Sequence, residues 1–261
     1  MSKNKNALSP KEQDIYFAIS NSKNRLFTIE MIRGLGIDSG AALRASLAGM
    51  VKKGWLIRIK RGTYYLREAG KGGIEDIFKI ATYMYNGYIA FSSALYLYNA
   101  MTERPYTVYV ATRTTSGSGT VGQMEIRAVA LKRRAMGMTE YEGYKISTRA
   151  KTIYDCFHMS EYAGGYSKVI EAVHAMDLNA DEWKEFMRYV ASFESDSSKR
   201  KIGYMLELAN KAGSGVPDAV IRSLKRKGPV VKLGKGLNGR YIKGWGIVDY
   251  LGEGYLLGWS R

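Results

Sequence analysis

The sequence of 261 residues lacks the features that mark secreted, membrane or disulfide-stabilised proteins. Its single cysteine, Cys156, excludes an internal disulfide and leaves too few thiols for a zinc site made of cysteines alone. No apolar run reaches the roughly 18 residues of a membrane-spanning helix, and no signal-peptide core follows the first lysines. The segment Met1–Lys5 also offers no lipidation signal or basic amphipathic anchor. These absences predict a cytoplasmic protein that does not bind membranes.

Acidic residues are scarce in the first and last parts of the chain. Residues 1–68 hold 13 Lys and Arg against 5 Asp and Glu, and residues 199–261 hold 13 against 4. The middle, residues 69–198, is nearly neutral with 14 against 15, and the formal net charge of the whole chain is +16. This distribution predicts two cationic surfaces that can attract a polyanion, and nucleic acid is the expected partner.

The pattern between Phe27 and Leu66 predicts a winged helix-turn-helix. A helix from Ser39 to Lys53 places its apolar residues on one stripe that can pack inward, namely Leu43, Leu47, Met50 and Val51. Small and polar residues occupy the other face, namely Ser39, Ala42, Arg44, Ala45, Ser46 and Gly49. A helix with such a face fits a major groove about 12 Å wide. Arg44 is its only long donor and can pair bidentately with guanine, so we expect it to read bases.

The segments beside this helix complete the motif. Thr28 and Asp38 can cap the preceding helix and the recognition helix, respectively, and Gly54 supplies the helix stop. Two alternating segments, 56–59 and 63–66, then predict a hairpin, the wing, whose tip carries Lys60 and Arg61. This tip would touch phosphate or reach a minor groove. The alternative is a protein-docking winged helix with solvated cations, but the charge distribution favours DNA.

The rest of the chain predicts a mixed α and β domain. We expect a linker over Glu68–Gly73, which divides the chain into a winged-helix domain, 1–72, and a larger C-terminal domain, 73–261, with a basic end over 199–261. Helices are expected over 74–86, 92–100, 148–160, 166–176, 181–193, 198–211 and 217–227, and strands over 106–112, 124–131, 144–147, 230–233, 246–250 and 255–259. A Gly/Ser/Thr loop is expected over 113–122. The predicted fold class is therefore α+β.

Cations and aromatic residues interleave near the end of the chain, from Arg222 to Trp259. This pattern favours a second nucleic-acid surface and also suits single strands or RNA, whereas a solvated face over ordinary core aromatics is the alternative. The side chains predicted to contact DNA are Ser39, Arg44, Ser46, Lys52, Lys53, Arg58, Lys60, Arg61 and Thr63 in the winged helix and Arg222, Lys225, Arg226 and Lys227 near the end.

Several segments together resemble the AbiEi family, antitoxin-type transcriptional regulators of type IV toxin–antitoxin systems. They are Lys60–Tyr64 at the wing, YIAFSSALYLYNAM (88–101), TVYVAT (107–112), KISTRAKTIYDCF (145–157) with Thr152 and Asp155, and KRKIGYMLE (199–207). The resemblance covers most of the chain. It implies a repressor that binds DNA upstream of its own operon, with a C-terminal domain that contributes to DNA contact and opposes a nucleotidyltransferase-like toxin without a stable complex. The strongly basic segment from Lys225 to Lys243 departs from a typical member.

Two glycine motifs and three possible metal ligands have simpler interpretations. The matches to Gly-x-Gly-x-x-Gly at 117–122 and 234–239 are each followed by strand-like sequence, whereas a dinucleotide site needs a helix N-terminus at the glycines, so hairpin loops are expected. Cys156, His158 and His174 lack the tight four-ligand spacing of a structural zinc site. We therefore expect neither cofactor nor metal.

A nuclease is the alternative from the enzyme class. Asp177 and Asp181 precede Glu182-Trp183-Lys184, an arrangement loosely similar to an acidic pair that holds Mg²⁺. However, residues 181–193 predict an amphipathic helix in which Asp181 and Glu182 favour the N-terminal dipole. No catalytic residue is therefore assigned. The other open alternatives are a winged-helix regulator unrelated to toxin control and an RNA-binding module.

Overall fold

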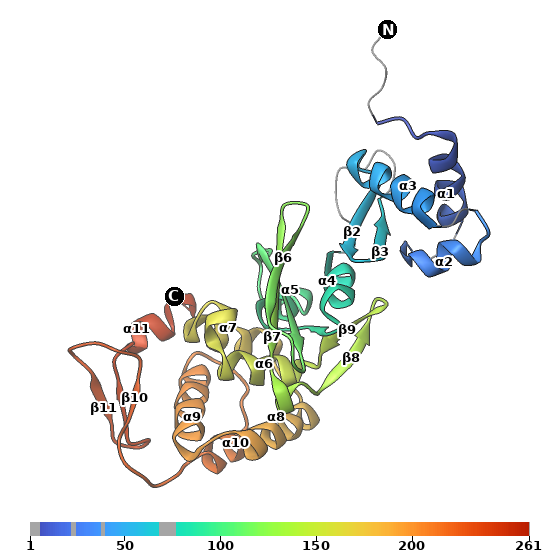
Figure 1. The fold of residues 1–261 in the computed structure, drawn as a ribbon. Helices are drawn as coiled ribbons and strands as arrows, with labels where there is room; N and C mark the ends of the chain where they lie inside the picture. Colours follow the sequence, from blue (N-terminus) through green and yellow to red (C-terminus); the bar gives the residue numbers. More distant parts are fainter. Residues whose placement is uncertain (1–5, 22–24, 38–39, 68–76, 261) are drawn as a thin grey trace.

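The N-terminal part of the chain is the predicted winged helix (Figure 1). The computed structural model describes residues 6–21, 25–37, 40–67 and 77–260. Its first elements are α1 (Pro10–Ser20), β1 (Leu26–Thr28), α2 (Ile29–Gly34), α3 (Gly40–Lys52), β2 (Leu56–Lys60) and β3 (Thr63–Leu66). The three strands form an antiparallel sheet in the order β1-β3-β2, here called the wing sheet.

Local capping bonds set where the first two helices begin. Helix α1 lies outside the predicted elements, although a capping box marks its start: the N–H of Ser9 donates to Glu12 Oε2 at 2.6 Å, and the N–H of Glu12 donates to Ser9 Oγ at 3.4 Å. Thr28 caps α2 as predicted, because its hydroxyl accepts from the N–H of Met31 at 3.3 Å. Asp38, the predicted cap of α3, lies outside the described residues.

The predicted apolar stripe of α3 forms the centre of the winged-helix core. Leu43, Leu47 and Met50 are fully buried, and Val51 is partly buried beside them. They pack with α1, α2 and one face of the wing sheet, through Ile15, Ile19, Phe27, Ile32, Leu56, Tyr64 and Leu66. Full burial of one such side chain contributes about 1.5–3 kcal/mol, so this stripe fixes which face of α3 is turned to solvent.

Residues 77–147 build a six-stranded mixed sheet that is covered on both faces. Its elements are α4 (Ile77–Tyr85), β4 (Tyr88–Ile89), α5 (Phe91–Leu97), β5 (Thr107–Thr112), β6 (Gly117–Val121), β7 (Met124–Ala130), η1 (Lys132–Arg134), β8 (Met138–Tyr141) and β9 (Tyr144–Ser147), and the strand order is β6-β7-β5-β4-β9-β8. Alternate residues of β5 face opposite ways. Val108 and Val110 pack with α4, whereas Ala111 packs with α5 and the later helices.

Strand β6 shows that the loop predicted over 113–122 is wrong. Gly117–Val121 pair antiparallel with β7, from Gly117 opposite Ala128 to Val121 opposite Met124. A Cβ on Gly119 would lie 2.5 Å from Met84 Cε and 3.2 Å from the Tyr85 hydroxyl of α4. The glycines therefore allow a helix to approach the strand closely, which composition alone does not distinguish from a loop.

Helices and a small sheet complete the chain. They are α6 (Arg149–His158), η2 (Ser160–Ala163), α7 (Tyr166–Met176), α8 (Ala180–Phe193), α9 (Asp196–Lys211), α10 (Asp218–Ser223), β10 (Val231–Leu233), β11 (Arg240–Ile242), β12 (Ile247–Asp249), α11 (Glu253–Leu256) and η3 (Gly258–Ser260). The strands form a sheet in the order β10-β12-β11, here called the C-terminal sheet. The predicted fold class, α+β, is confirmed.

The strand predicted over 255–259 is wrong, because this segment is helical. Asp249 Oδ1 accepts from the N–H groups of Leu251 at 2.8 Å and Gly252 at 3.1 Å, which ends β12 in a turn. Gly252 then has a φ of +80° and starts α11, which buries Leu256 in the core. The turn therefore replaces a further strand with a helix.

The wing sheet is held against α4 of the second part. Its face opposite the winged-helix core carries Leu26, Ile59 and Tyr65, which share one hydrophobic cluster with Ile77 and Ile80 of α4. The predicted linker over 68–73 lies outside the described residues. Both faces of the wing sheet are therefore covered, one by α3 and its neighbours and one by α4.

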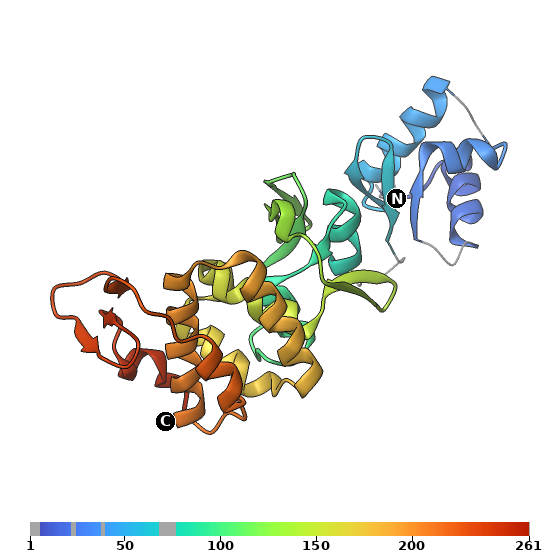
Figure 2. The same ribbon diagram turned by 90° about the horizontal axis from the view of Figure 1, so that it is seen from below.

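The described parts of the chain are arranged in a row. Two views turned by 90° both place the winged helix at one end, the six-stranded sheet in the middle and the C-terminal sheet at the other end (Figures 1 and 2). The two basic parts of the sequence thus lie far apart in the folded chain, with the neutral middle between them.

Candidate nucleic-acid interfaces

The exposed face of α3 is made of small residues around one arginine. Ala41, Ala45 and Ala48 are exposed, and so are Arg44 and Lys52. The described residues provide no hydrogen bond or ion pair to the Arg44 guanidinium, which is therefore available to a ligand. A helix with this surface can enter a major groove and present Arg44 to base edges.

Three other α3 positions, predicted on the outer face, do not add to the exposed surface of the described helix. Ser39 lies outside the described residues, and Ser46 is partly buried. Gly49 faces α1, because a Cβ there would lie 2.5 Å from Glu12 Oε1. The prediction that Gly49 lies on the outward face is therefore wrong. Its small size instead lets α1 and α3 approach each other.

Lys53, predicted to contact DNA, is engaged inside the winged helix. Its ammonium donates to Glu12 Oε2 in an ion pair, and the Glu12 side chain is only 5% exposed. Burial raises the pKa of Glu12, but hydrogen bonds from Lys53 and Ser9 outweigh it and hold this pKa below its ordinary value. The pair fastens the end of α3 to α1, so it positions the recognition helix.

The wing presents cations beside the second part of the chain. Arg58, Lys60 and Arg61 are exposed, and Lys60 Nζ lies 3.4 Å from the carbonyl oxygen of Tyr83 in α4. Thr63 is 7% exposed, so its hydroxyl does not form part of the outer surface. The tip of the wing can therefore offer positive charge to phosphates while its strands are held in place by α4.

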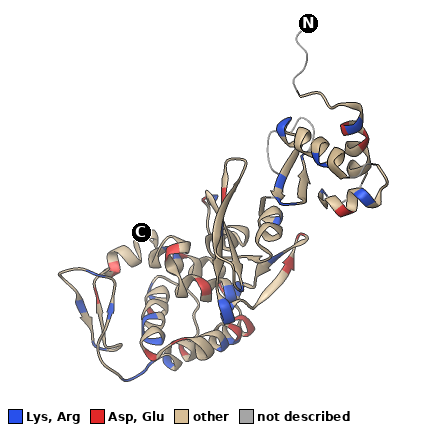
Figure 3. Cartoon of the chain, viewed as in Figure 1, with Lys and Arg blue, Asp and Glu red and all other residues tan. Residues whose placement is uncertain are grey.

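The predicted cations near the end of the chain are exposed at the opposite end of the molecule. Arg222 lies 3.8 Å from Asp218, and Arg226 lies 3.4 Å from Asp196, both as exposed pairs. Lys225 Nζ lies 5.4 Å from the ring centroid of Trp245. Lys227 is exposed as well. Figure 3 shows Lys and Arg at both ends of the molecule, which agrees with the charge distribution of the sequence.

One face of α9 anchors the segment that carries these cations. The Arg200 guanidinium donates to the carbonyl oxygens of Pro229 at 2.7 Å and of Trp245 and Gly246 at 3.4 Å each. Tyr204 donates to Asp249 at 3.0 Å, and Trp245 donates to Glu207 at 3.1 Å. A Cβ on Gly203 would lie 2.3 Å from the Trp245 ring. The motif at 199–207 therefore holds the C-terminal sheet on the domain.

The motif at 145–157 lies in the interior and forms a buried polar group. Ser147 and Thr152 share a hydroxyl–hydroxyl hydrogen bond of 2.6 Å, and Lys151 forms an ion pair with Asp155. Lys151 and Asp155 are both inaccessible to solvent. Burial raises the pKa of Asp155 to about 6 against the opposing effect of Lys151, and burial lowers the pKa of Lys151. This group joins β9 to α6 in the interior of the domain.

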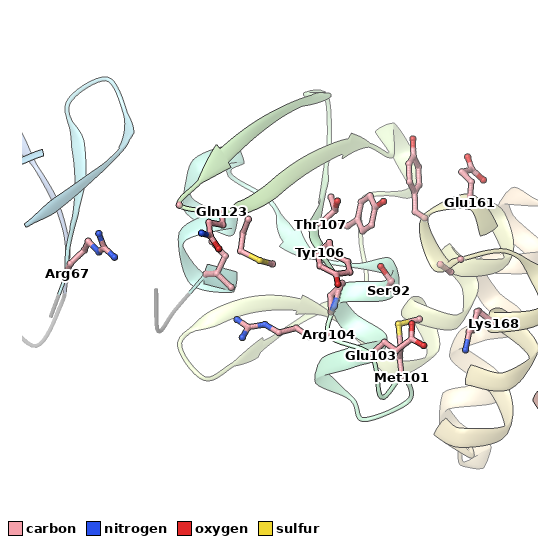
Figure 4. A pocket seen from close by; sticks show the side chains of 18 residues that line it. Arg67, Ser92, Met101, Glu103, Arg104, Tyr106, Thr107, Gln123, Glu161 and Lys168 are labelled. Carbon is pink, nitrogen blue, oxygen red and sulfur yellow. The ribbon is translucent and has the colours of Figure 1, made fainter. Parts of the chain in front are cut away.

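A groove of about 1200 Å³ opens beside β5 and β7 (Figure 4). Its two labelled cations, Arg104 and Lys168, lie at opposite sides of it, and Tyr106 between them is 92% exposed. Acid–base or nucleophilic chemistry needs such groups within hydrogen-bond reach of one reacting atom. Arg104 and Lys168 are therefore too far apart to act on one reacting atom.

The residues considered for nuclease or metal chemistry have separate surroundings. Glu182 completes a capping box with Asn179 and pairs with Arg149 at 3.0 Å, while Asp181 pairs with Lys184 at 2.8 Å. Asp177 ends α7 with a φ of +42°. Cys156 is buried in the core, His158 pairs with Glu194, and His174 contacts Ser214. Among the described residues, no three His, Cys, Asp or Glu side chains are grouped to hold a metal.

The glycine motifs also lie away from helix starts. The first, 117–122, forms β6, and the second, 234–239, is the connection between β10 and β11. Because β10 and β11 are not neighbours in the sheet, the second is a crossing loop and not the expected hairpin loop. Neither motif places a helix dipole at its glycines, as a dinucleotide site requires.

Comparisons with known proteins agree with this architecture. Residues 14–67 match the family described as "Transcriptional regulator, AbiEi antitoxin", which confirms the expected resemblance for this part of the chain; this is a family of regulators and not of enzymes. A crystal structure of the RV2827C protein from Mycobacterium tuberculosis is similar over 97% of this chain and 95% of that chain, with a TM-score of 0.71 and 13% identity, so the fold is shared. None of the curated proteins compared with the chain matches it. Within the described residues no helix has both the length and the apolar character needed to span a bilayer.

Proposed function

We propose that this chain, whose residues 14–67 match the AbiEi antitoxin regulators, represses its own operon by binding double-stranded DNA upstream of its gene. The observation that carries the proposal is Arg44, an exposed arginine among exposed alanines on the outer face of α3. With this helix in the major groove, Arg44 pairs with O6 and N7 of a guanine and selects the sequence. Such a repressor works in the cytoplasm.

The other predicted contacts supply affinity. Lys52 follows Arg44 on the outer face of α3, and Arg58, Lys60 and Arg61 extend the positive surface along the wing. These cations neutralise phosphates, which gives binding that depends steeply on salt and little on sequence. Lys53 positions the recognition helix through its ion pair with Glu12. Arg222, Lys225, Arg226 and Lys227 form a separate contact at the far end.

We further propose that the chain acts as an antitoxin. The domain after residue 72, with its buried core and basic end, opposes a nucleotidyltransferase-like toxin without forming a stable complex with it. The support is the regulator family of the winged helix and the presence of a large second part beyond what DNA reading needs. A neighbouring gene that encodes a nucleotidyltransferase separates this function from that of a winged-helix regulator unrelated to toxin control.

Two protomers can share one operator. An inverted repeat would place two copies with their recognition helices in successive major grooves, separated by about 34–36 Å or a multiple of it. The half-site spacing in the bound DNA therefore tests this pairing directly.

The deciding experiment measures fluorescence anisotropy of labelled DNA from upstream of the gene, with unrelated DNA as the control, over a salt series. The intact chain should prefer the upstream DNA by roughly 10³-fold or more. Arg44→Ala should weaken binding to this DNA by about 5- to 150-fold and leave binding to unrelated DNA nearly unchanged, because a bidentate arginine–guanine pair contributes about 1–3 kcal/mol of discrimination.

Two further variants sharpen the result. Arg61→Ala should weaken binding to every duplex alike and reduce the salt slope by about 0.9, as expected for one phosphate contact. Lys184→Ala removes an exposed cation from α8, away from the winged helix, and should change neither quantity. Equal affinity of the intact chain for upstream and unrelated DNA would contradict the proposal.

A further inference from the structure

The C-terminal sheet belongs to a segment of concentrated positive charge. Between Arg222 and Val248 the sequence contains eight Lys and Arg residues and no Asp or Glu: Arg222, Lys225, Arg226, Lys227, Lys232, Lys235, Arg240 and Lys243. All eight are exposed. Figure 3 shows Lys and Arg on the strands at this end of the molecule. A polyanion is the ligand that complements such a surface.

One face of the C-terminal sheet is turned away from the domain and carries an exposed aromatic ring. The register places Lys232 of β10 and Tyr241 of β11 beside Val248 of the central strand, so these three side chains share a face. The opposite face holds Leu233 and Ile247, which are fully buried against the domain. Tyr241 is 56% exposed, and its row is therefore the outer one.

The glycine-rich loop 234–239 lies along the same face. A Cβ on Gly239 would lie 2.4 Å from Val248 Cγ1 and 2.7 Å from Tyr250 Cε1, so only glycine allows the loop to approach the sheet this closely. The loop exposes Lys235, and its Leu237 is 99% exposed. Lys232 Nζ lies 6.0 Å from the Tyr250 ring centroid. The outer face and its loop thus expose two lysines, Lys232 and Lys235, in addition to the Tyr241 ring.

We propose that this outer face binds single-stranded nucleic acid. An unpaired base stacks on the Tyr241 ring, and Lys232, Lys235 and Lys243 contact the phosphates on either side of it. In a duplex, each base is covered on both faces by its neighbours, so it cannot stack on an exposed tyrosine. A single strand presents an uncovered base face that can stack on this ring.

The position of the sheet makes this a separate site. The winged helix lies at the other end of the molecule in both views, so a straight segment of DNA bound along α3 is remote from Tyr241 (Figures 1 and 2). Hydrogen bonds join Arg200, Tyr204 and Glu207 of α9 to the segment that forms the sheet, and they hold it on the domain. The outer face is therefore pre-formed, which reduces the ordering cost of binding.

The test uses the full chain with three labelled probes of 12 units: oligouridine RNA, oligothymidine DNA and an unrelated DNA duplex. We expect the single strands to bind more tightly than the duplex in moderate salt. Tyr241→Ala should weaken single-strand binding by about 5- to 150-fold, the range for loss of one stacked base, and Tyr241→Phe should restore it. Which of RNA and DNA binds better identifies the natural strand.

Matched controls separate this site from the winged helix. Tyr106→Ala removes a tyrosine that is 92% exposed elsewhere and should leave single-strand binding unchanged. Arg44→Ala should also leave it unchanged, and saturation with upstream duplex should not displace the single strand. Unchanged binding by Tyr241→Ala, displacement by the duplex, or equal affinity for all three probes would overturn the proposal, whatever the outcome of the operator experiment.

Discussion

The wing sheet and the C-terminal sheet each have three short strands beside a cluster of cations, but they differ in what covers them. All four residues of β3 are buried, because the winged-helix core covers one face of the wing sheet and α4 covers the other. In the C-terminal sheet, Leu233 and Ile247 are buried while Tyr241 stays exposed on the other face. The first sheet can offer a ligand only its edge and tip, whereas the second can offer a surface.

The two sheets also differ in what holds them. Apolar contacts with Ile77 and Ile80 fix the wing sheet on α4. The C-terminal sheet is fixed by the buried side chains of Leu233 and Ile247 and also by polar bonds with one face of α9, where the Trp245 ring packs against Gly203. Variants at these two attachments should therefore have different consequences for the two ends of the molecule.

The largest effect is expected at the attachment of the C-terminal sheet. Trp245 is 3% exposed, and Trp245→Ala would leave a cavity beside Gly203, which should lower the free energy of unfolding by about 3–5 kcal/mol. Urea unfolding followed by circular dichroism measures this. Tyr241→Ala, on the open face of the same sheet, should change stability by only about 0.5 kcal/mol or less. Similar losses in the two variants would mean that the outer face is also packed.

A somewhat smaller effect is expected where the wing sheet meets α4. Ile59 is 4% exposed, so Ile59→Ala should cost about 2–5 kcal/mol by leaving a cavity between the sheet and the helix. The same urea experiment measures it, with the less buried Ile57→Ala as the milder comparison. Because α4 positions the wing, Ile59→Ala should also weaken binding to duplex DNA while single-strand binding persists. Loss of duplex binding and single-strand binding together would show that the two ends of the molecule do not bind independently.

The smallest effect concerns acid and the winged helix alone. Glu12 has a pKa below its ordinary value of 4.5 in the folded chain, so its interactions stabilise the fold above about pH 4.5 and are lost as the pH falls through the folded pKa. Glu12→Gln should cost about 1.5–3 kcal/mol at pH 7, the range for hydrogen bonds to charged groups. Thermal unfolding between pH 7 and pH 3 should then show a shallower loss of stability in the variant. An identical slope would show that folding does not lower the pKa of Glu12.

Local signals in the sequence were sufficient to predict much of the winged helix. The spacing of Leu43, Leu47 and Met50 predicted the buried stripe of α3, and Gly54 predicted its end. The alternation around Lys60 and Arg61 predicted the hairpin. Each of these features depends on residues only a few positions apart, which is the range over which periodicity and turn chemistry act.

The features that required the structure depend on contacts between distant segments. Gly49 belongs to the outer face by composition, but Glu12 occupies the space beside it. Likewise, Gly119 suggests a loop until Met84 is known to lie against it. The packing of Ile59 on α4 leaves no local trace in the sequence. The exposed Arg44 was predictable as a candidate, whereas the engagement of Lys53 and the burial of Thr63 were not.

For the proposed repressor, the contact between the wing sheet and α4 would set how bound copies are arranged along DNA. A winged helix fixed in this way cannot rotate freely, so a bound copy points its remaining domain in a direction set by the groove that it occupies. Since the duplex turns once in about 10–10.5 base pairs, two half-sites a whole number of turns apart would place both C-terminal domains on one side of the DNA. Inserting half a turn would move one of them to the opposite side. The rotational phase of the operator, and not only its sequence, would then decide whether two copies can act together.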